Sequence, residues 1–172
     1  MDDEEPEVTP EMIEAGSAVY CNATEDQRPE DVVREIYIAM LDLRPSLFTS
    51  AVAAVADAPP GGVVVHCAGG KDRTGLTVGM ALAVAGVSTD LIAADYAITE
   101  SRLADEAAAH LETITDPERR EIVARLQPTP AANMIQVFDH LNDKYGSIEG
   151  FLEAGGMTET QFRALRDRLV EA

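Results

Sequence analysis

Residues 63–75, which read VVVHCAGGKDRTG, constrain the fold of this chain more than any other stretch. The three valines form a short apolar, β-branched run of the kind found in buried strands. Cys67 follows this run, and five residues separate it from Arg73. Over residues 74–85 the chain is apolar at helical spacing, and Gly86 closes the pattern. The stretch therefore predicts a strand, a tight loop and a helix, with the reactive side chains where the loop meets the helix.

The loop at 68–73 is predicted to bind an anion, phosphate above all. A helix N-terminus has backbone N–H groups without partners and carries partial positive charge. Gly69 and Gly70 allow the loop to curl so that successive N–H groups point inward. Arg73 adds a planar fork for two phosphate oxygens, and Lys71 adds a further cation.

Cys67 lies at the base of this predicted positive site. A field that favours phosphate also favours a thiolate, so we expect a thiol pKa below the reference of about 8.5. A thiolate in line with a bound phosphorus atom is a nucleophile for phosphoryl transfer. Asp72 can exchange a proton with oxygens at the rim, the Thr74 hydroxyl can reach the sulfur, and His66 can brace the loop from behind. A Walker A loop is excluded, because aspartate follows the Gly-Lys pair.

Residues 66–75, HCAGGKDRTG, resemble the signature loop of the cysteine-dependent protein tyrosine phosphatases, including its Cys-x5-Arg spacing. Within this family, the segment Gly-Lys-Asp-Arg-Thr-Gly is similar to the loop of the bacterial and fungal branch, which has a lipid-phosphatase-like loop. Residues 95–96 (DY), and the region from 145–147 (YGS) to 165–166 (LR), also resemble this group. The resemblance extends over roughly residues 17–172.

This resemblance implies a role for each loop residue. Cys67 would be the nucleophile, Arg73 the phosphate clamp and Asp72 the general acid. Asp26 or Asp31 remain as alternatives for the acid, as on the mobile loop of other tyrosine phosphatases. His66 and Thr74 would support the loop. The substrate phosphate would lie on the backbone of Ala68, Gly69, Gly70, Lys71, Asp72 and Arg73.

The predicted fold is α/β and protein-tyrosine-phosphatase-like, with a small central sheet, incomplete in this chain, and a large majority of helix. An acidic disordered tail is expected at 1–14 and a single phosphatase-like domain at 15–172. The strand at 63–66 needs neighbours, of which 17–22 can supply one. The segment 101–113 is read as an ordinary solvated helix rather than a mobile lid. Because the family's usual N-terminal segment is not recognisable, the chain looks like the C-terminal two-thirds of a member. Helices are predicted at 30–43, 45–57, 74–85, 89–99, 101–113, 116–126, 131–145, 148–154 and 158–171.

Composition and charge restrict the classes of molecule that this chain is expected to bind. The net charge of −18 argues against nucleic acid, and weakly favours a small phosphoester over a highly anionic inositol phosphate. No run is long and apolar enough to span a membrane, and no signal peptide is visible, which predicts a cytoplasmic protein and is compatible with leaderless secretion. Cys21 and Cys67 do not form a disulfide framework. No cluster has metal-ligand spacing, so neither a metal nor a cofactor is expected. Nothing indicates an oligomeric state.

The sequence thus predicts a protein tyrosine phosphatase that hydrolyses phosphomonoesters through a phosphocysteine intermediate. The expected substrate is a phosphotyrosine protein or a phosphoinositide, with dual specificity as a variant. The alternative is a catalytically impaired phosphate-binding module derived from a truncated phosphatase. A rhodanese-like sulfurtransferase or an arsenate reductase shares the cysteine-loop plan, but the five-residue spacing favours phosphoryl transfer.

Overall fold

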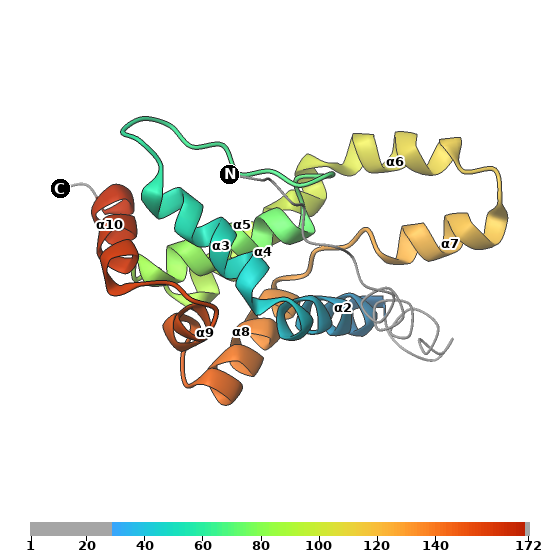
Figure 1. Cartoon of the computed structure of the whole chain (residues 1–172). Helices are drawn as coiled ribbons and strands as arrows, with labels where there is room; N and C mark the ends of the chain where they lie inside the picture. The colour runs from blue at the N-terminus through green and yellow to red at the C-terminus, as the bar shows by residue number, and fades with distance from the viewer. Residues whose placement is uncertain (1–28, 171–172) are drawn as a thin grey trace, which may run out of the picture.

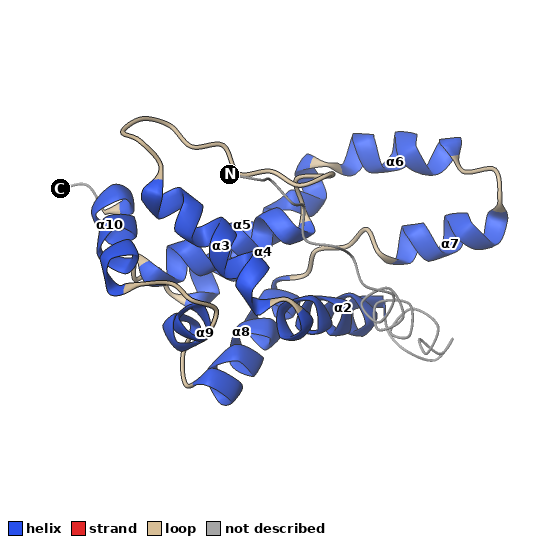
Figure 2. Ribbon diagram, viewed as in Figure 1, coloured by secondary structure: helices blue, strands red, loops and turns tan. Residues whose placement is uncertain are grey.

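A computed structural model describes residues 29–170 as helices joined by loops (Figures 1 and 2). The predicted helices are confirmed in this range, with small differences at their ends. The predicted tail and the segment 17–22 lie outside the described residues. The helices are α2 (Pro29–Leu43), α3 (Pro45–Asp57), α4 (Asp72–Val84), α5 (Thr89–Arg102), α6 (Ala104–Thr113), α7 (Pro117–Arg125), α8 (Ala131–Tyr145), α9 (Ile148–Ala154) and α10 (Glu159–Leu169).

Helix α8 is the centre of the core. It packs against α2, α5 and α9. Met134, Val137, Phe138 and Leu141 recur at helical spacing along it, and each is at most 1% exposed. The helix ends at Gly146, which has φ +82°, a left-handed conformation that glycine adopts without strain. The apolar face that the sequence predicts for 131–145 is therefore the face of α8 that the other helices cover.

Helix α4 packs against four other helices of the core. It packs against α5 and α9 as well as against α3 and α10. A Cβ atom at Gly79 would lie 3.2 Å from Ile92 of α5 and 3.2 Å from Phe138 of α8, so the absence of a side chain lets these residues approach α4. Leu76 and Met80 of the same helix are at most 1% exposed. The N-terminus of α4, where the predicted loop ends, is thereby fixed in place.

Local capping sets the ends of the later helices. Asp116 accepts hydrogen bonds from the first turn of α7, and Ser147 accepts one from Gly150 in α9. Thr158 and Gln161 form a capping box at the start of α10. No single helix in the described range is long and apolar enough to cross a membrane. Helices α2 and α3 meet the length and composition test only when they are counted together across an 84° bend.

Helices α6 and α7 form a hairpin that projects away from the helical body (Figure 1). Neither helix has a buried side chain. The exposure of α6 agrees with the prediction of a solvated helix at 101–113. At the base of the hairpin, Lys71 Nζ donates to the carbonyl oxygens of Leu126 (2.8 Å) and Gln127 (3.0 Å).

The strand predicted at 63–66 is wrong for the described structure, in which residues 62–67 have no regular secondary structure. Val64 is 86% exposed and Val63 is 40% exposed. A strand exists only when a neighbour accepts and donates its backbone hydrogen bonds, and no described segment lies beside 63–66 in that way. The small central sheet is therefore not found among residues 29–170.

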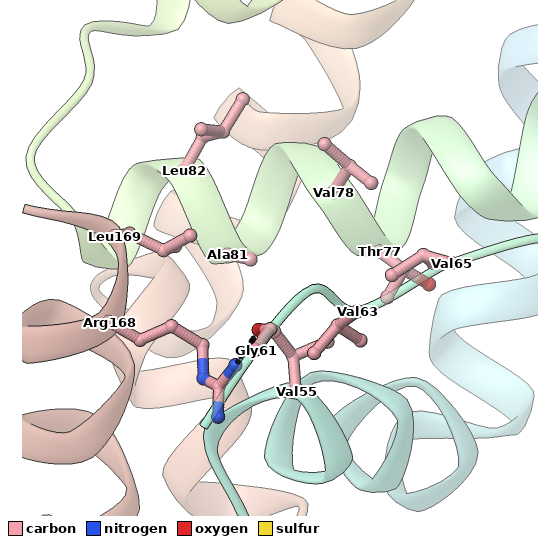
Figure 3. A pocket seen from close by; sticks show the side chains of 10 residues that line it. All are labelled: Val55, Gly61, Val63, Val65, Thr77, Val78, Ala81, Leu82, Arg168 and Leu169. Carbon is pink, nitrogen blue, oxygen red and sulfur yellow. Dashed lines mark hydrogen bonds between the residues drawn. The ribbon is translucent and has the colours of Figure 1, made fainter. Parts of the chain in front are cut away.

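A cavity of about 280 Å³ lies beside this irregular segment. Figure 3 shows that Val63 and Val65 line it together with Val78 and side chains of neighbouring helices. Arg168 of α10 donates to the carbonyl oxygen of Gly61 at 3.1 Å. The segment is thus anchored where it leaves α3, is exposed at Val63 and Val64, and contacts the core again at Val65.

Candidate active site

The loop 67–71 leads directly into α4. Gly70 has φ +63°, which side chains rarely adopt, so this position requires glycine for the turn. Gly69 has no positive φ, and a Cβ atom there would meet nothing within 4 Å. Of the two glycines that the sequence singled out, only Gly70 is demanded by the backbone of this structure.

The first turn of α4 has no side-chain cap. Lys71 is in the N-cap position and its side chain caps no N–H group, while Asp72 is the first helical residue. The first hydrogen bond of the helix type runs from the Gly75 N–H to the Lys71 carbonyl oxygen at 2.7 Å. The N–H groups of Asp72 and Arg73 are therefore available to an anion beside the loop, while the backbone of Thr74 is hydrogen-bonded to Cys67.

Cys67 is a half-buried free thiol at the start of the loop. Burial opposes its ionisation, but hydrogen bonds from the Thr74 side chain and from backbone groups of Thr74, Lys71 and Gly69 outweigh it. Together they lower the pKa of the Cys67 thiol from about 9 to about 7. The lowered pKa favours the thiolate form of Cys67 near neutral pH.

The two loop cations are placed differently. Arg73 is exposed, and its guanidinium makes no ion pair or hydrogen bond with another residue in 29–170. The ammonium of Lys71 is only partly accessible because it is bound to the Leu126 and Gln127 carbonyls. Arg73 is thus the cation available to a ligand, whereas Lys71 joins the loop to the α6–α7 hairpin.

The Asp72 carboxylate is partly exposed at the start of α4. Its Oδ1 atom accepts a hydrogen bond from the hydroxyl of Tyr37 and lies 3.6 Å from Lys71 Nζ. Of the two alternative acids, Asp31 accepts a hydrogen bond from Arg34 at 2.6 Å, and Asp26 is outside the described residues. The described part of the chain thus places one candidate acid, Asp72, within the loop itself.

His66 is exposed, and its Nδ1 atom lies 3.4 Å from the Cys67 carbonyl oxygen. This is a long contact, so it gives the loop only limited support. Within residues 29–170, no three histidine, cysteine, aspartate or glutamate side chains are grouped so that they could hold a metal ion. The chemistry available at the loop is that of a thiolate, a guanidinium, a carboxyl group and backbone N–H groups.

The sequence profile described as "Tyrosine phosphatase family" matches residues 8–171, and the chain belongs to this family. Among its relatives is a "Tyrosine-protein phosphatase" of Nostoc commune. It is 31% identical over 148 residues, which cover 83% of this chain and 50% of the relative. The "Triple specificity protein phosphatase PtpB" of Mycobacterium tuberculosis is 28% identical over 123 residues, covering 63% of this chain and 44% of the relative. The chain spans half or less of the length of these relatives.

Sequence reasoning missed two buried residues behind the loop, Tyr37 of α2 and Tyr96 of α5. They are 2% and 4% exposed. Tyr37 lies within the helix predicted at 30–43, and a buried tyrosine needs a partner for its hydroxyl. The Asp-Tyr pair at 95–96 was noticed only as a point of resemblance. Polar aromatic residues on the apolar faces of predicted helices were the signal that could have found both.

Proposed function

We propose that this chain hydrolyses phosphomonoesters through a phosphocysteine intermediate, with phosphotyrosine as the main substrate class. The observation that carries the proposal is the position of Cys67 in a loop that ends at the N-terminus of α4, where Arg73 has no ion pair or hydrogen bond with another residue in 29–170. The lowered pKa of Cys67 supports it. The names of the relatives support the substrate class. Phosphoserine, phosphothreonine and phosphoinositides are variants that the resemblance of the loop sequence implies, and one relative is named a triple specificity phosphatase.

In the first step, the Cys67 thiolate attacks phosphorus and a sulfur–phosphorus bond forms. The bond between phosphorus and the leaving oxygen breaks, and its electron pair stays on that oxygen. Asp72 protonates the leaving oxygen, so that a neutral hydroxyl departs. Arg73 and the backbone N–H groups of 68–73 stabilise the equatorial oxygens, on which negative charge is spread in the transition state.

In the second step, water attacks the phosphocysteine. An oxygen–phosphorus bond forms, the sulfur–phosphorus bond breaks and the Cys67 thiolate is restored. The Asp72 carboxylate accepts a proton from the attacking water, which returns it to the acid form needed for the next cycle. Because the nucleophilic thiol must stay reduced, the proposal favours the cytoplasm as the site of action.

The test is phosphate release from a phosphotyrosine peptide by the purified chain and by its Cys67→Ser variant. Cys21→Ser is the matched control, because it removes the other cysteine. We expect turnover in the wild type and in Cys21→Ser and no measurable turnover in Cys67→Ser. Acid quenching during turnover should leave phosphate on the peptide that contains Cys67. Equal turnover in the wild type and Cys67→Ser would exclude the thiolate mechanism.

A second candidate function is phosphate binding without turnover. The observation behind it is the irregular segment before Cys67, in which Val64 is 86% exposed. A binding module would gain thermal stability with increasing inorganic phosphate and release no phosphate from any ester. Turnover in the peptide assay would exclude it.

A further inference from the structure

Three polar side chains from three helices meet behind the catalytic loop. Tyr37 of α2 donates its hydroxyl hydrogen bond to Oδ1 of Asp72 at the start of α4. The hydroxyl of Tyr96 on α5 lies 2.5 Å from that of Tyr37. The two rings are edge to face, with centroids 6.4 Å apart and planes at 77°. A buried chain of hydroxyl groups therefore ends on the partly exposed carboxyl group.

The direction of this chain follows from the chemistry of its end. An ionised carboxylate only accepts hydrogen bonds, so Tyr37 donates to Asp72. The oxygen of Tyr37 then accepts from Tyr96. Burial, together with the nearby Asp72 carboxylate, raises the pKa of both phenols, so both remain protonated donors across the neutral range. Each donor polarises the next, and the hydrogen bond to Asp72 gains strength from its neighbour.

The two oxygens of Asp72 are not equivalent. Oδ1 faces Tyr37 and Lys71, whereas Oδ2 makes no hydrogen bond or ion pair with any residue in 29–170. A carboxylic acid whose Oδ1 receives a hydrogen bond keeps that bond when its own proton is on Oδ2. With the proton on Oδ1, the hydroxyl of Tyr37 would have to turn away from its acceptor. The arrangement thus favours Oδ2 as the oxygen that carries the proton.

Gly75 explains how Tyr96 reaches this position. A Cβ atom at Gly75 would lie 2.7 Å and 2.9 Å from two ring atoms of Tyr96, closer than real contacts allow. The absence of a side chain lets the ring lie directly against the first turn of α4. Gly75, which follows Arg-Thr in the loop motif, therefore provides the space that the Tyr96 ring occupies.

We propose that Tyr37, supported by Tyr96, is the positioning residue of the Asp72 carboxyl group, occupying Oδ1 and confining the transferable proton to Oδ2. This inference rests on the proposed function, in which Asp72 is the general acid. Tyr37 does not touch the substrate. Its effect reaches the reaction only through the proton that Asp72 delivers to the leaving oxygen.

The test is the Tyr37→Phe variant, assayed with two substrates that differ in their need for an acid. Phenyl phosphate has a poor leaving group and requires protonation, whereas p-nitrophenyl phosphate has a good one. We expect kcat/KM to fall about 10-fold with phenyl phosphate and less than about 2-fold with p-nitrophenyl phosphate. A merely structural role would lower both equally. The value of kcat/KM is used because it reports the step that cleaves the ester bond.

Two further variants complete the design. Tyr96→Phe should show the same selective loss to a smaller extent, and it carries the test if Tyr37→Phe fails to unfold cooperatively. Tyr145→Phe, which removes a hydroxyl from α8, is the matched control and should leave both substrates unaffected. Tyr145 packs edge to face on Phe151, outside the hydroxyl chain.

The Asp72→Asn background separates the possible outcomes. With the acid already removed, Tyr37→Phe should add less than about 2-fold on either substrate. The positioning role would be overturned if turnover depends on Asp72 but Tyr37→Phe lowers kcat/KM equally with both substrates. It would also be overturned if the effect of Tyr37→Phe adds fully to that of Asp72→Asn. Either result would leave the proposed function intact. No turnover in the wild type would overturn the proposed function, and this inference with it.

Discussion

The two sides of the Cys67 loop differ sharply in how the chain supports them. Upstream, residues 62–67 are irregular, Val64 is 86% exposed and a cavity of about 280 Å³ lies beside them. Downstream, α4 is packed against four helices, and its first residue is hydrogen-bonded to a buried tyrosine. The downstream side is held by the core, whereas the upstream segment packs against the core through Val65 and leaves Val63 and Val64 exposed.

This difference shows how the two kinds of secondary structure obtain their hydrogen bonds. Helix α4 satisfies its backbone internally, so it needs only apolar neighbours, and α3, α5, α9 and α10 supply them. The valines at 63–65 could satisfy their backbone only against another extended segment. The first turn of α4 and the Asp72 carboxylate are therefore held in place by residues 29–170, whereas most of the segment that leads to Cys67 is exposed.

The largest expected effect tests this contrast through stability. Phe138→Ala in α8 removes a ring that is 1% exposed, and we expect it to lower the free energy of unfolding by about 3–5 kcal/mol. Val64→Ala in the irregular segment should change it by less than about 0.5 kcal/mol. Urea unfolding of both variants gives the comparison. A cost for Val64→Ala of about 2 kcal/mol would mean that this side chain is buried in solution, and the contrast between the two sides would fail.

A smaller effect is expected at Arg73, which sharpens the functional side of the contrast. Arg73→Lys keeps the charge but loses the planar fork, so kcat/KM with a phosphotyrosine peptide should fall by about 10²–10³. Arg163→Lys on the exposed face of α10 is the matched control and should match the wild type. Thermal unfolding should be similar for both variants, because neither residue is buried. An unchanged kcat/KM in Arg73→Lys would remove Arg73 from the proposed site.

Local patterns predicted the helices well and the sheet badly, for a physical reason. The helical faces at 131–145 and 45–57 and the closing Gly86 depend on neighbours a few residues away, which the sequence displays. The strand at 63–66 depends on a partner segment that the sequence does not identify. The same limit applies at the site. Spacing placed Cys67 and Arg73 in one loop, but Tyr37 reaches Asp72 only through the packing of α2 on the core.

The cations show a similar limit. From the sequence, Lys71 is predicted to bind phosphate together with Arg73, because both lie in the same loop. In the structure its ammonium binds two carbonyl oxygens at the end of α7, 55 and 56 residues away. A short motif gives the order of its side chains, but not which of them a distant segment engages.

The most direct test of the account is the ionisation of Cys67 itself. The rate of alkylation by iodoacetamide is measured against pH in the Cys21→Ser chain, so that one thiol reacts. Because the thiolate is the reactive form and its pKa is lowered, the rate should rise with pH to a plateau with a midpoint at about 7. Thr74→Val should move the midpoint upward, and inorganic phosphate should slow the reaction. A midpoint near 9, the ordinary value, with no effect of Thr74→Val, would contradict the claim that this loop and helix N-terminus build a thiolate site.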